Sequence, residues 1–381
     1  MYRVMAAVLV CCATPAVGQT PAPEEELRAE IARLRESLAR AEALLDRLSS
    51  QGPVGAPTPA PVPGPPPRRA PALNTPPKLP PSEPESFTKP PPRIDVLLQS
   101  RYDHFADRSR PDTFFLRKAE VGFKGHISSS VDFSLELDLA RTQANDPYRR
   151  TYVRFAPFRR LHLKAGMEKA PLGLEELTAT AQVPFVDRSE VTDRFAAAEE
   201  VGIFGESTWD RLMIQASVTN GGRRLYRDDN RRKAVTARAV WAPSPRLSLG
   251  AATMKGETGP QLLDRDRYNV EVKYAPNDIQ GAQGELYRAK DGEVWSTAFY
   301  VEAYWAFPAK KGLLTHLMPM ARYEHIERDD RDRASELRLI TLGGALLLDG
   351  YRSKLQFNWL KDVRDSAPRK SEFRAQYLVA F

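Results

Sequence analysis

Lysines and arginines recur on one face of segments in which apolar and polar residues alternate. Such side chains donate charge-assisted hydrogen bonds to anions, and an arginine can offer two parallel donors. If the segments are strands of one barrel, their polar face lines a lumen, and its cations form a ladder of sites from which an ion can also leave. The candidate lumen cations on these segments are Lys118, Lys124, Arg154, Arg160, Lys164, Arg238, Lys273 and Arg322.

A long stretch without strand pattern, from Ala170 to Phe195, interrupts the alternation, and Lys169, Arg188 and Arg194 are its cations. Connections of this length inside a compact domain are uncommon and usually functional. The stretch carries apolar residues, including Leu172 and Phe185, that need to be buried. We therefore expect it to fold into the lumen of a membrane barrel and to set the width and charge of a pore. The alternative is a surface loop packed on its own side chains.

Carboxylates occupy the same inward face and leave a second interpretation of the cations open. With salt bridges between the two signs, the lumen would be a solvated wall of mixed charge rather than an anion ladder. Further carboxylates in the long stretch weaken the case for anions. The inward acids are Asp95, Glu120, Asp132, Glu136, Asp138, Glu168 and Glu271, and those of the stretch are Glu175, Glu176, Asp187 and Glu190.

No catalytic constellation stands out in the chain. The five histidines show no metal-ligand spacing, and there is neither a G-x-S-x-G motif nor a glycine loop of the kind that cradles phosphates. We expect no enzymatic activity, no cofactor, no metal and no nucleic-acid partner.

The first 18 residues have the pattern of a secretion signal, with Arg3, an apolar core from Val4 to Val10, and a small-residue cleavage site at Ala16-Val17-Gly18. Cys11 and Cys12 would leave with it. No later apolar run reaches the roughly 18 residues that a transmembrane helix needs. The formal net charge is +7, which indicates either a basic surface or a lumen that attracts anions.

Two further segments precede the alternating part. Residues 24–49 predict a coiled-coil helix, which is stable only through self-association, and the alternative is a single amphipathic helix lying on another surface. Residues 50–92 are rich in proline and predict an extended linker. The apolar seam of the helix, spaced by four and three residues, is Leu27, Ile31, Leu34, Leu38, Ala41, Leu45 and Leu48.

Residues 93–381 predict an all-β fold, a 16-stranded antiparallel transmembrane barrel. Short turns alternate along the chain with longer, charged loops, as in outer-membrane barrels, and the connection from Pro308 to Thr315 is long for its class. The last strand is amphipathic and ends on Phe381. A barrel of this size encloses an aqueous channel. The strands begin near residues 93, 115, 131, 149, 160, 201, 212, 234, 246, 268, 281, 296, 316, 336, 352 and 372.

Four motifs resemble the phosphate-selective porin O and P family. They are Phe115-Leu-Arg-Lys-Ala-Glu-Val-Gly-Phe-Lys-Gly125, Gly166-Met-Glu-Lys-Ala-Pro-Leu-Gly-Leu-Glu-Glu-Leu-Thr178, Phe185-Val-Asp-Arg-Ser189 and Val218-Thr-Asn-Gly-Gly222. The resemblance implies a homotrimeric outer-membrane porin with 16 strands per subunit and its third loop folded inward. It also implies passive diffusion of small anions, phosphate among them, past lysines and arginines, with the coiled coil and linker in the periplasm.

Two other functions fit the same organisation. The barrel could anchor a structural tether whose coiled coil reaches into the periplasm, or an adhesin that uses the charged outer loops. Deleting residues 20–92 would abolish a tether but would leave the conductance of a porin. Trimming 221–233 would matter more to an adhesin than changes in the lumen.

Overall fold

The computed structural model describes residues 91–106, 110–140, 147–222, 228, 230–328, 336–364 and 371–381. The predicted signal segment, the coiled coil and nearly all of the linker lie outside these residues. Within them, no helix combines the length and the apolar character needed to cross a membrane.

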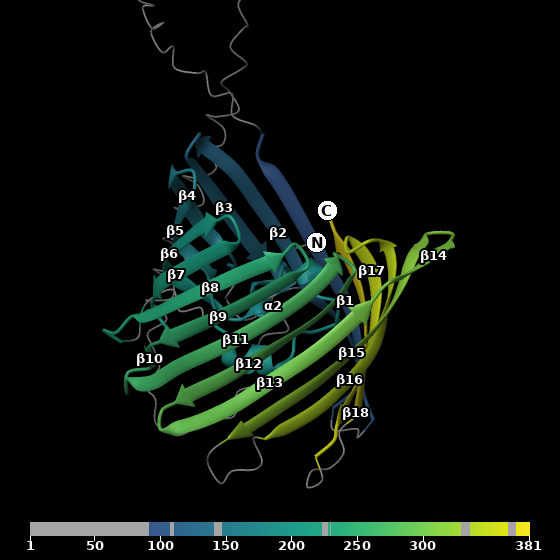
Figure 1. Cartoon of the computed structure of the whole chain (residues 1–381). Helices are drawn as coiled ribbons and strands as arrows, with labels where there is room; N and C mark the ends of the chain where they lie inside the picture. Colours follow the sequence, from purple (N-terminus) through teal and green to yellow (C-terminus); the bar gives the residue numbers. More distant parts are fainter. Residues whose placement is uncertain are drawn as a thin grey trace, which may run out of the picture. The chain divides into compact units, whose positions relative to one another are not determined.

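One antiparallel sheet contains all the strands of the described part (Figure 1). Its first and last strands pair from Leu97↔Ala380 to Phe105↔Glu372, so the sheet closes on itself. The strands are β1 Arg93–Phe105, β2 Thr113–Ser128, β3 Val131–Asp138, β4 Thr151–Phe158, β5 Leu161–Lys169, β6 Glu199–Trp209, β7 Leu212–Thr219, β8 Ala234–Ser244, β9 Leu247–Lys255, β10 Glu257–Thr258, β11 Leu263–Asn277, β12 Gln280–Asp291, β13 Val294–Trp305, β14 Phe307–Lys311, β15 Leu314–Arg328, β16 Leu337–Asp349, β17 Ser353–Asp362 and β18 Ser371–Ala380.

Sixteen of these strands form the barrel, because β10 and β14 only extend hairpins. Strand β9 pairs directly with β11, and β13 pairs directly with β15. The short β10 continues the first of these hairpins and β14 the second. The predicted all-β fold, a closed antiparallel barrel of 16 strands, is confirmed.

Three connections differ from the sequence expectation. Strand β11 begins at Leu263, before the expected start near Tyr268, because β10 pairs with its first residues. The long connection after Pro308 is itself a hairpin, in which β14 pairs with β15 and Gly312 turns with φ 62°. By the alternation, the connection between strands β12 and β13 belongs to the end with the longer loops. It is instead a two-residue turn in which Gly292 has φ 61°. Glycine adopts this left-handed conformation without steric cost.

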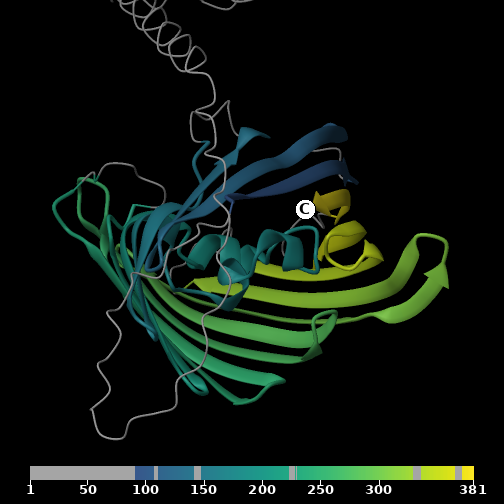
Figure 2. The same cartoon turned by 90° about the horizontal axis from the view of Figure 1, so that it is seen from above.

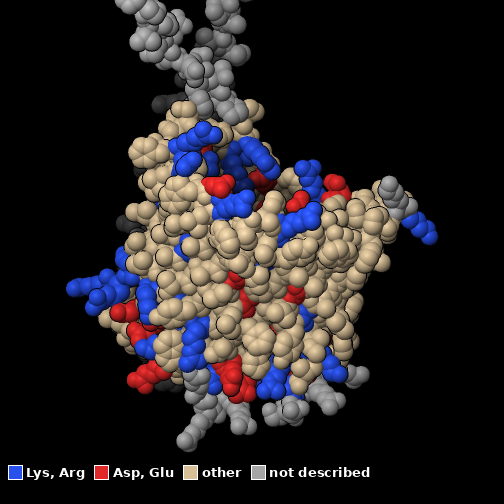
Figure 3. Space-filling model, in the orientation of Figure 1, with Lys and Arg blue, Asp and Glu red and all other residues tan. Residues whose placement is uncertain are grey.

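The strands place polar residues inside and apolar residues outside. Along β11, Asn269 and Glu271 are buried, whereas Val270 and Val272 are exposed. The outer face seen in Figure 3 is mostly uncharged over the middle of the strands, and the charged residues gather toward the two ends. This inversion of the soluble pattern is typical of a barrel whose outer face does not meet water.

The segment between β5 and β6 lies within the ring of strands (Figure 2). It contains the short helices α2 Leu174–Leu177 and α3 Glu190–Phe195 and the 3-10 helix η2 Thr180–Gln182. Its apolar residues are buried against inward side chains of the wall, with Leu172 and Phe195 in a cluster around Tyr287 and Tyr300. Phe185 belongs to a second cluster with Tyr304, Met318, Met320 and Leu347. We call residues 170–198 the inner segment.

Two glycines face each other where β5 leads into the inner segment, and they generate a stability prediction. Gly166 pairs with Gly202, and a Cβ on Gly166, which has φ 133°, would press on the Thr151 carbonyl oxygen. We expect Gly166→Ala to destabilise the barrel by about 2 kcal/mol. The measurement is the temperature at which folded protein loses its anomalous mobility on a gel. Gly205→Ala is the control, since its Cβ would meet Leu163 at an ordinary 3.6 Å; equal midpoints for both variants would contradict the prediction.

Candidate functional site

A buried carboxylate of the barrel wall holds the start of the inner segment. Glu285 on β12 accepts hydrogen bonds from the backbone N–H groups of Leu174 and Glu175, each at 2.9 Å. Its oxygens also accept the hydroxyls of Tyr287 and Tyr300, each at 2.8 Å. The first N–H groups of a helix have no partner within the helix, and here the wall provides one.

A second buried carboxylate, Glu175 of α2, joins the inner segment to β15. Its Oε1 pairs with Arg322 at 2.8 Å, and its Oε2 accepts the backbone N–H of Ser189 at 2.9 Å. Arg322 also pairs with Glu302 at 2.7 Å and lies 4.0 Å from the centre of the Phe185 ring. Arg322, a predicted anion site, is therefore fully engaged in holding the segment.

Three alternate residues of β17 bind the backbone of residues 181–186. Lys354 donates to the carbonyls of positions 181 and 183 at 2.9 and 2.6 Å. Gln356 donates to those of positions 184 and 185 at 2.5 and 2.9 Å, and Asn358 accepts the N–H of position 186 at 2.6 Å. The inward face of one strand thus satisfies a row of backbone groups that no sheet pairs.

Asp187 ends this row and meets arginines from three strands. Its carboxylate lies 2.7 Å from Arg101 on β1, 2.8 Å from Arg374 on β18 and 3.7 Å from Arg117 on β2. Burial alone would raise the pKa of Asp187, but the three guanidinium groups lower it below its usual range. Because β1 and β18 are the closing pair of the barrel, we call this set the Asp187 clamp.

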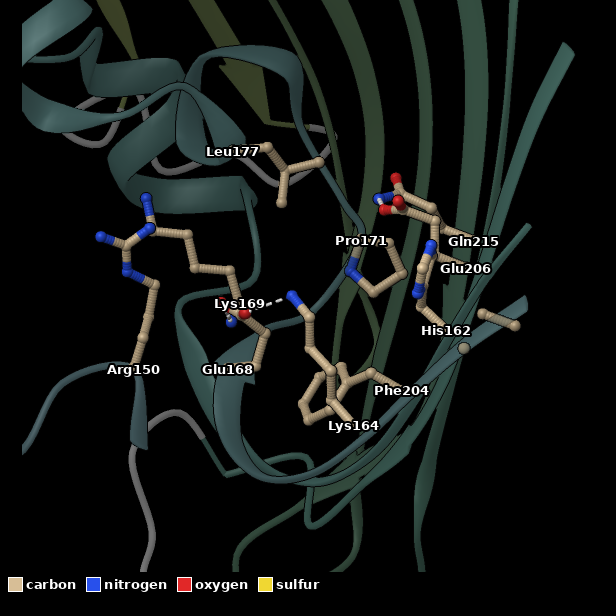
Figure 4. Close-up of a pocket in the computed structure, with 12 residues that line it drawn as sticks. Arg150, His162, Lys164, Glu168, Lys169, Pro171, Leu177, Phe204, Glu206 and Gln215 are labelled. Carbon is tan, nitrogen blue, oxygen red and sulfur yellow. Dashed lines mark hydrogen bonds and ion pairs between the residues drawn. The ribbon is translucent and has the colours of Figure 1, made fainter. Parts of the chain in front are cut away.

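Open space remains beside the inner segment along β1 to β7, which we call the open side. One cavity of about 210 Å³ lies between Pro171 and Leu177 of the inner segment and the wall of β5 to β7. Figure 4 shows Arg150, Lys164 and Lys169 among its lining side chains, with His162, Glu206 and Gln215 across the space. A second cavity of about 520 Å³ is lined by residues 179–182 and by β1 to β3, and Arg150 borders both.

Four cations on this open side are paired, and each of the four is more exposed to water than its partner. Arg150 is bonded to Glu136 at 2.8 Å, and their side chains are 34% and 9% exposed. Arg154 is bonded to Asp132 at 2.7 Å, with 39% and 19% exposed. Lys124 with Asp95, and Lys164 with Glu168, each bonded at 2.6 Å, show the same order. In these four pairs the carboxylate is the less exposed group, and the cation is the group that a solute in the lumen meets first.

The other predicted cations have positions that differ from these four. Lys118 is buried between Glu120 and Thr180, and Arg238 is buried against Gln215 and Glu271. Both side chains are buried, so neither is accessible to a solute in the cavities. Arg160 is exposed in the turn between β4 and β5, and Lys273 is half-buried beside a cavity of about 460 Å³.

The predicted cations at the inner segment are also engaged. Lys169 pairs with Glu176 at 3.3 Å, and Arg194 lies 3.8 Å from Glu190. Arg188 donates to the backbone carbonyls of positions 175 and 178 at 3.0 and 2.8 Å. Arg188 therefore braces the inner segment internally.

Sequence reasoning did not single out several residues of this site. Arg150, at the junction of the two cavities, directly precedes β4, where strand alternation gives no direction for its side chain. Lys354, Gln356 and Asn358 share the inward face of β17 and could have been found by alternation alone. The described residues contain no group of His, Cys, Asp or Glu suited to hold a metal ion.

Comparison with known proteins identifies the family that this chain is similar to. The model of the phosphate-selective porin O and P family matches residues 98–262, which confirms the resemblance of the motifs. No curated protein matches the chain.

Solved porin structures share the fold at low identity. Salmonella typhi OmpF in complex with daunomycin has a TM-score of 0.57 and 11% identity, over 76% of this chain and 97% of that one. An anion-selective porin from Comamonas acidovorans has a TM-score of 0.55 and 13% identity, over 76% and 99%. A mutant of the Rh. blastica porin has a TM-score of 0.55 and 14% identity, over 76% and 100%.

The Asp187 clamp generates a prediction for Asp187→Asn. Removing the negative charge leaves three arginines without their shared partner, and we expect a loss of about 3 kcal/mol in stability at pH 7. A carboxyl with a lowered pKa stabilises the fold above the ordinary aspartate range, near 4, and loses that contribution as the pH falls through its folded pKa. The difference in thermal midpoint between variant and parent should therefore shrink in strong acid. A difference that is absent at pH 7 would contradict the clamp.

Asp193 on α3 provides a matched variant, because its pKa is shifted in the opposite direction to that of Asp187. Surrounding protein and the negative charges of Asp187, Glu175, Glu190 and Glu176 raise its pKa to about 7. Its ionisation therefore costs stability, and the cost grows as the pH rises from the ordinary range toward 7. Asp193→Asn should raise the thermal midpoint at pH 8 and leave it unchanged at pH 4. A lower midpoint at pH 8 would show that the charge stabilises the segment.

Proposed function

We propose that this protein, whose residues 98–262 match the phosphate-selective porin O and P family, is an outer-membrane porin. It forms a water-filled channel through which small solutes diffuse passively, with a preference for anions such as phosphate. The outward apolar face meets lipid, and closure of the sheet pairs the first strand with the last, so neither is left as an open edge. The working form is a homotrimer, with the short turns, the linker and the coiled coil in the periplasm.

The observation that carries the anion preference is the order of exposure in the ion pairs on the open side. A solute moving along β1 to β5 passes Lys124, Arg154, Arg150 and Lys164, while their carboxylates lie deeper in the wall. The interaction of a solute with each charge falls with distance, so the nearer cation outweighs the deeper carboxylate. Anions therefore meet weak sites that they can also leave, as conduction requires.

We also propose that the inner segment narrows the channel. A barrel of 16 strands is wide enough to leave an aqueous channel. Here the inner segment is bonded to β12, β15, β17 and β18, and also to β1 and β2 through Asp187 and Thr180. We place the route in the two cavities that Arg150 borders, between that segment and the wall of β1 to β7.

Single-channel current in a planar bilayer tests this function. Under a KCl gradient we expect a reversal potential that favours chloride, and partial block by added phosphate. Preference for chloride without block would leave a general anion-leaning porin. Preference for potassium would overturn the anion proposal, and well-folded protein without conductance would favour the tether.

A charge variant sharpens the prediction. In Lys124→Gln/Arg154→Gln/Lys164→Gln the carboxylates remain while the cations that shield them are gone. We expect the permeability ratio of chloride to potassium to fall by about fivefold, the equivalent of about 1 kcal/mol in watery surroundings. The control is Arg211→Gln, which removes an exposed cation from the turn between β6 and β7. An unchanged ratio in the triple variant would show that other residues set the selectivity.

A further inference from the structure

The hairpin of β14 and β15 extends beyond the barrel at the end with the short turns. Figures 1 and 2 show it leaving the ring of strands sideways. Strand β15 pairs with β16 from His316 to Ile326, so residues 309–315 have no strand beside them except within the hairpin. By comparison, the turn between β6 and β7 at the same end has only two residues.

The tip of this hairpin combines apolar and basic residues. Its sequence, Ala309-Lys-Lys-Gly-Leu-Leu314, contains no acidic residue. Leu313 is 82% exposed, and Lys311 is exposed beside it. A single exposed apolar side chain needs no partner of its own, so what matters here is the surface that Leu313 continues.

The outer face of the hairpin continues the apolar face of the barrel. Trp305, Phe307 and Leu317 are exposed on that face, in line with Val301 farther along β13. Their inward neighbours Ala306 and Met318 are buried. The surface that covers the barrel wall therefore also covers the base of the hairpin, and the tip lies at its edge.

We propose that the hairpin tip docks into the headgroup region of the phospholipid layer at the turn end, with Leu313 in the acyl boundary and Lys311 on anionic headgroups. This rests on the proposed function only in placing the barrel in a membrane. Tryptophan and lysine beside leucine suit the interface, where the apolar parts are buried and the ammonium reaches phosphate. A second copy of the chain is the weaker occupant, because the tip has no acid to pair with basic groups and continues a lipid-facing surface.

Fluorescence quenching in vesicles tests the docking. The full chain carries Cys11→Ser and Cys12→Ser, and a bimane label is attached at Leu313→Cys, Asp210→Cys or Val301→Cys. Asp210 is the matched control, at a short turn of the same end with a 93% exposed side chain, and Val301 reports the lipid-facing wall. We expect brominated phospholipid to quench the labels at 313 and 301, and aqueous iodide to quench the label at 210.

The outcomes separate this proposal from the proposed function. Lipid quenching at 301 with iodide quenching at 313 would overturn the hairpin proposal and leave the barrel in the membrane. Shielding of 313 from both quenchers, with disulfide cross-linking between copies, would assign the tip to a second subunit and also overturn it. Absence of lipid quenching at 301 would contradict the membrane barrel itself.

The headgroup contact has its own test. Brominated phosphatidylglycerol should quench the label at 313 more than brominated phosphatidylcholine at equal mole fraction. The preference should fall by about fivefold in Lys311→Gln, the effect of one cation at an anionic surface. The control is Lys255→Gln, at the end of the barrel away from the hairpin, which should leave the preference for phosphatidylglycerol unchanged. Equal quenching by both lipids in the parent chain would remove the anionic headgroup from the proposal.

Discussion

A chain segment that crosses the inside of a barrel must find hydrogen-bond partners for its backbone, and this requirement organises the lumen. Residues 181–186 have no strand beside them, and Lys354, Gln356 and Asn358 of β17 supply the missing donors and acceptor. Glu285 does the same for the start of α2. The cost of burying these charged and polar side chains is offset because each is paired with backbone or with an opposite charge.

This anchoring determines where charge remains available to a solute. Arg322 and Asp187 form ion pairs that hold the inner segment against the wall. On the open side Lys124, Arg154, Arg150 and Lys164 pair with carboxylates of the wall rather than of the inner segment, and these cations are more exposed than their partners. The mixed-charge wall and the cation-lined route for anions, two alternatives at the level of sequence, coexist because pairing and exposure are separate properties. Each pair is neutral as a whole, but its more exposed member is the cation, so the surface that faces the solute is cationic.

The fold was largely predictable because the alternation of apolar and polar residues is a local pattern that continues along each strand. The strands beginning at Leu212 and Ala234 start where their sequence pattern begins. The site was less predictable, because partners depend on register between strands. Alternation places Arg154 inward, but only the pairing Asp132↔Arg154 shows which carboxylate it meets. The meeting of Asp187 with arginines of β1, β2 and β18 depends on the path of the inner segment, which no local pattern encodes.

The most direct test of this account is the reactivity of single cysteines during channel recording, with Cys11 and Cys12 replaced by serine. Gln215 lines the cavity on the open side, whereas Gln283 is buried beneath the inner segment beside Tyr300. A charged thiol reagent should reduce the current through Gln215→Cys and leave Gln283→Cys unaffected. Block at Gln283→Cys without block at Gln215→Cys would place the route on the other side and contradict the account.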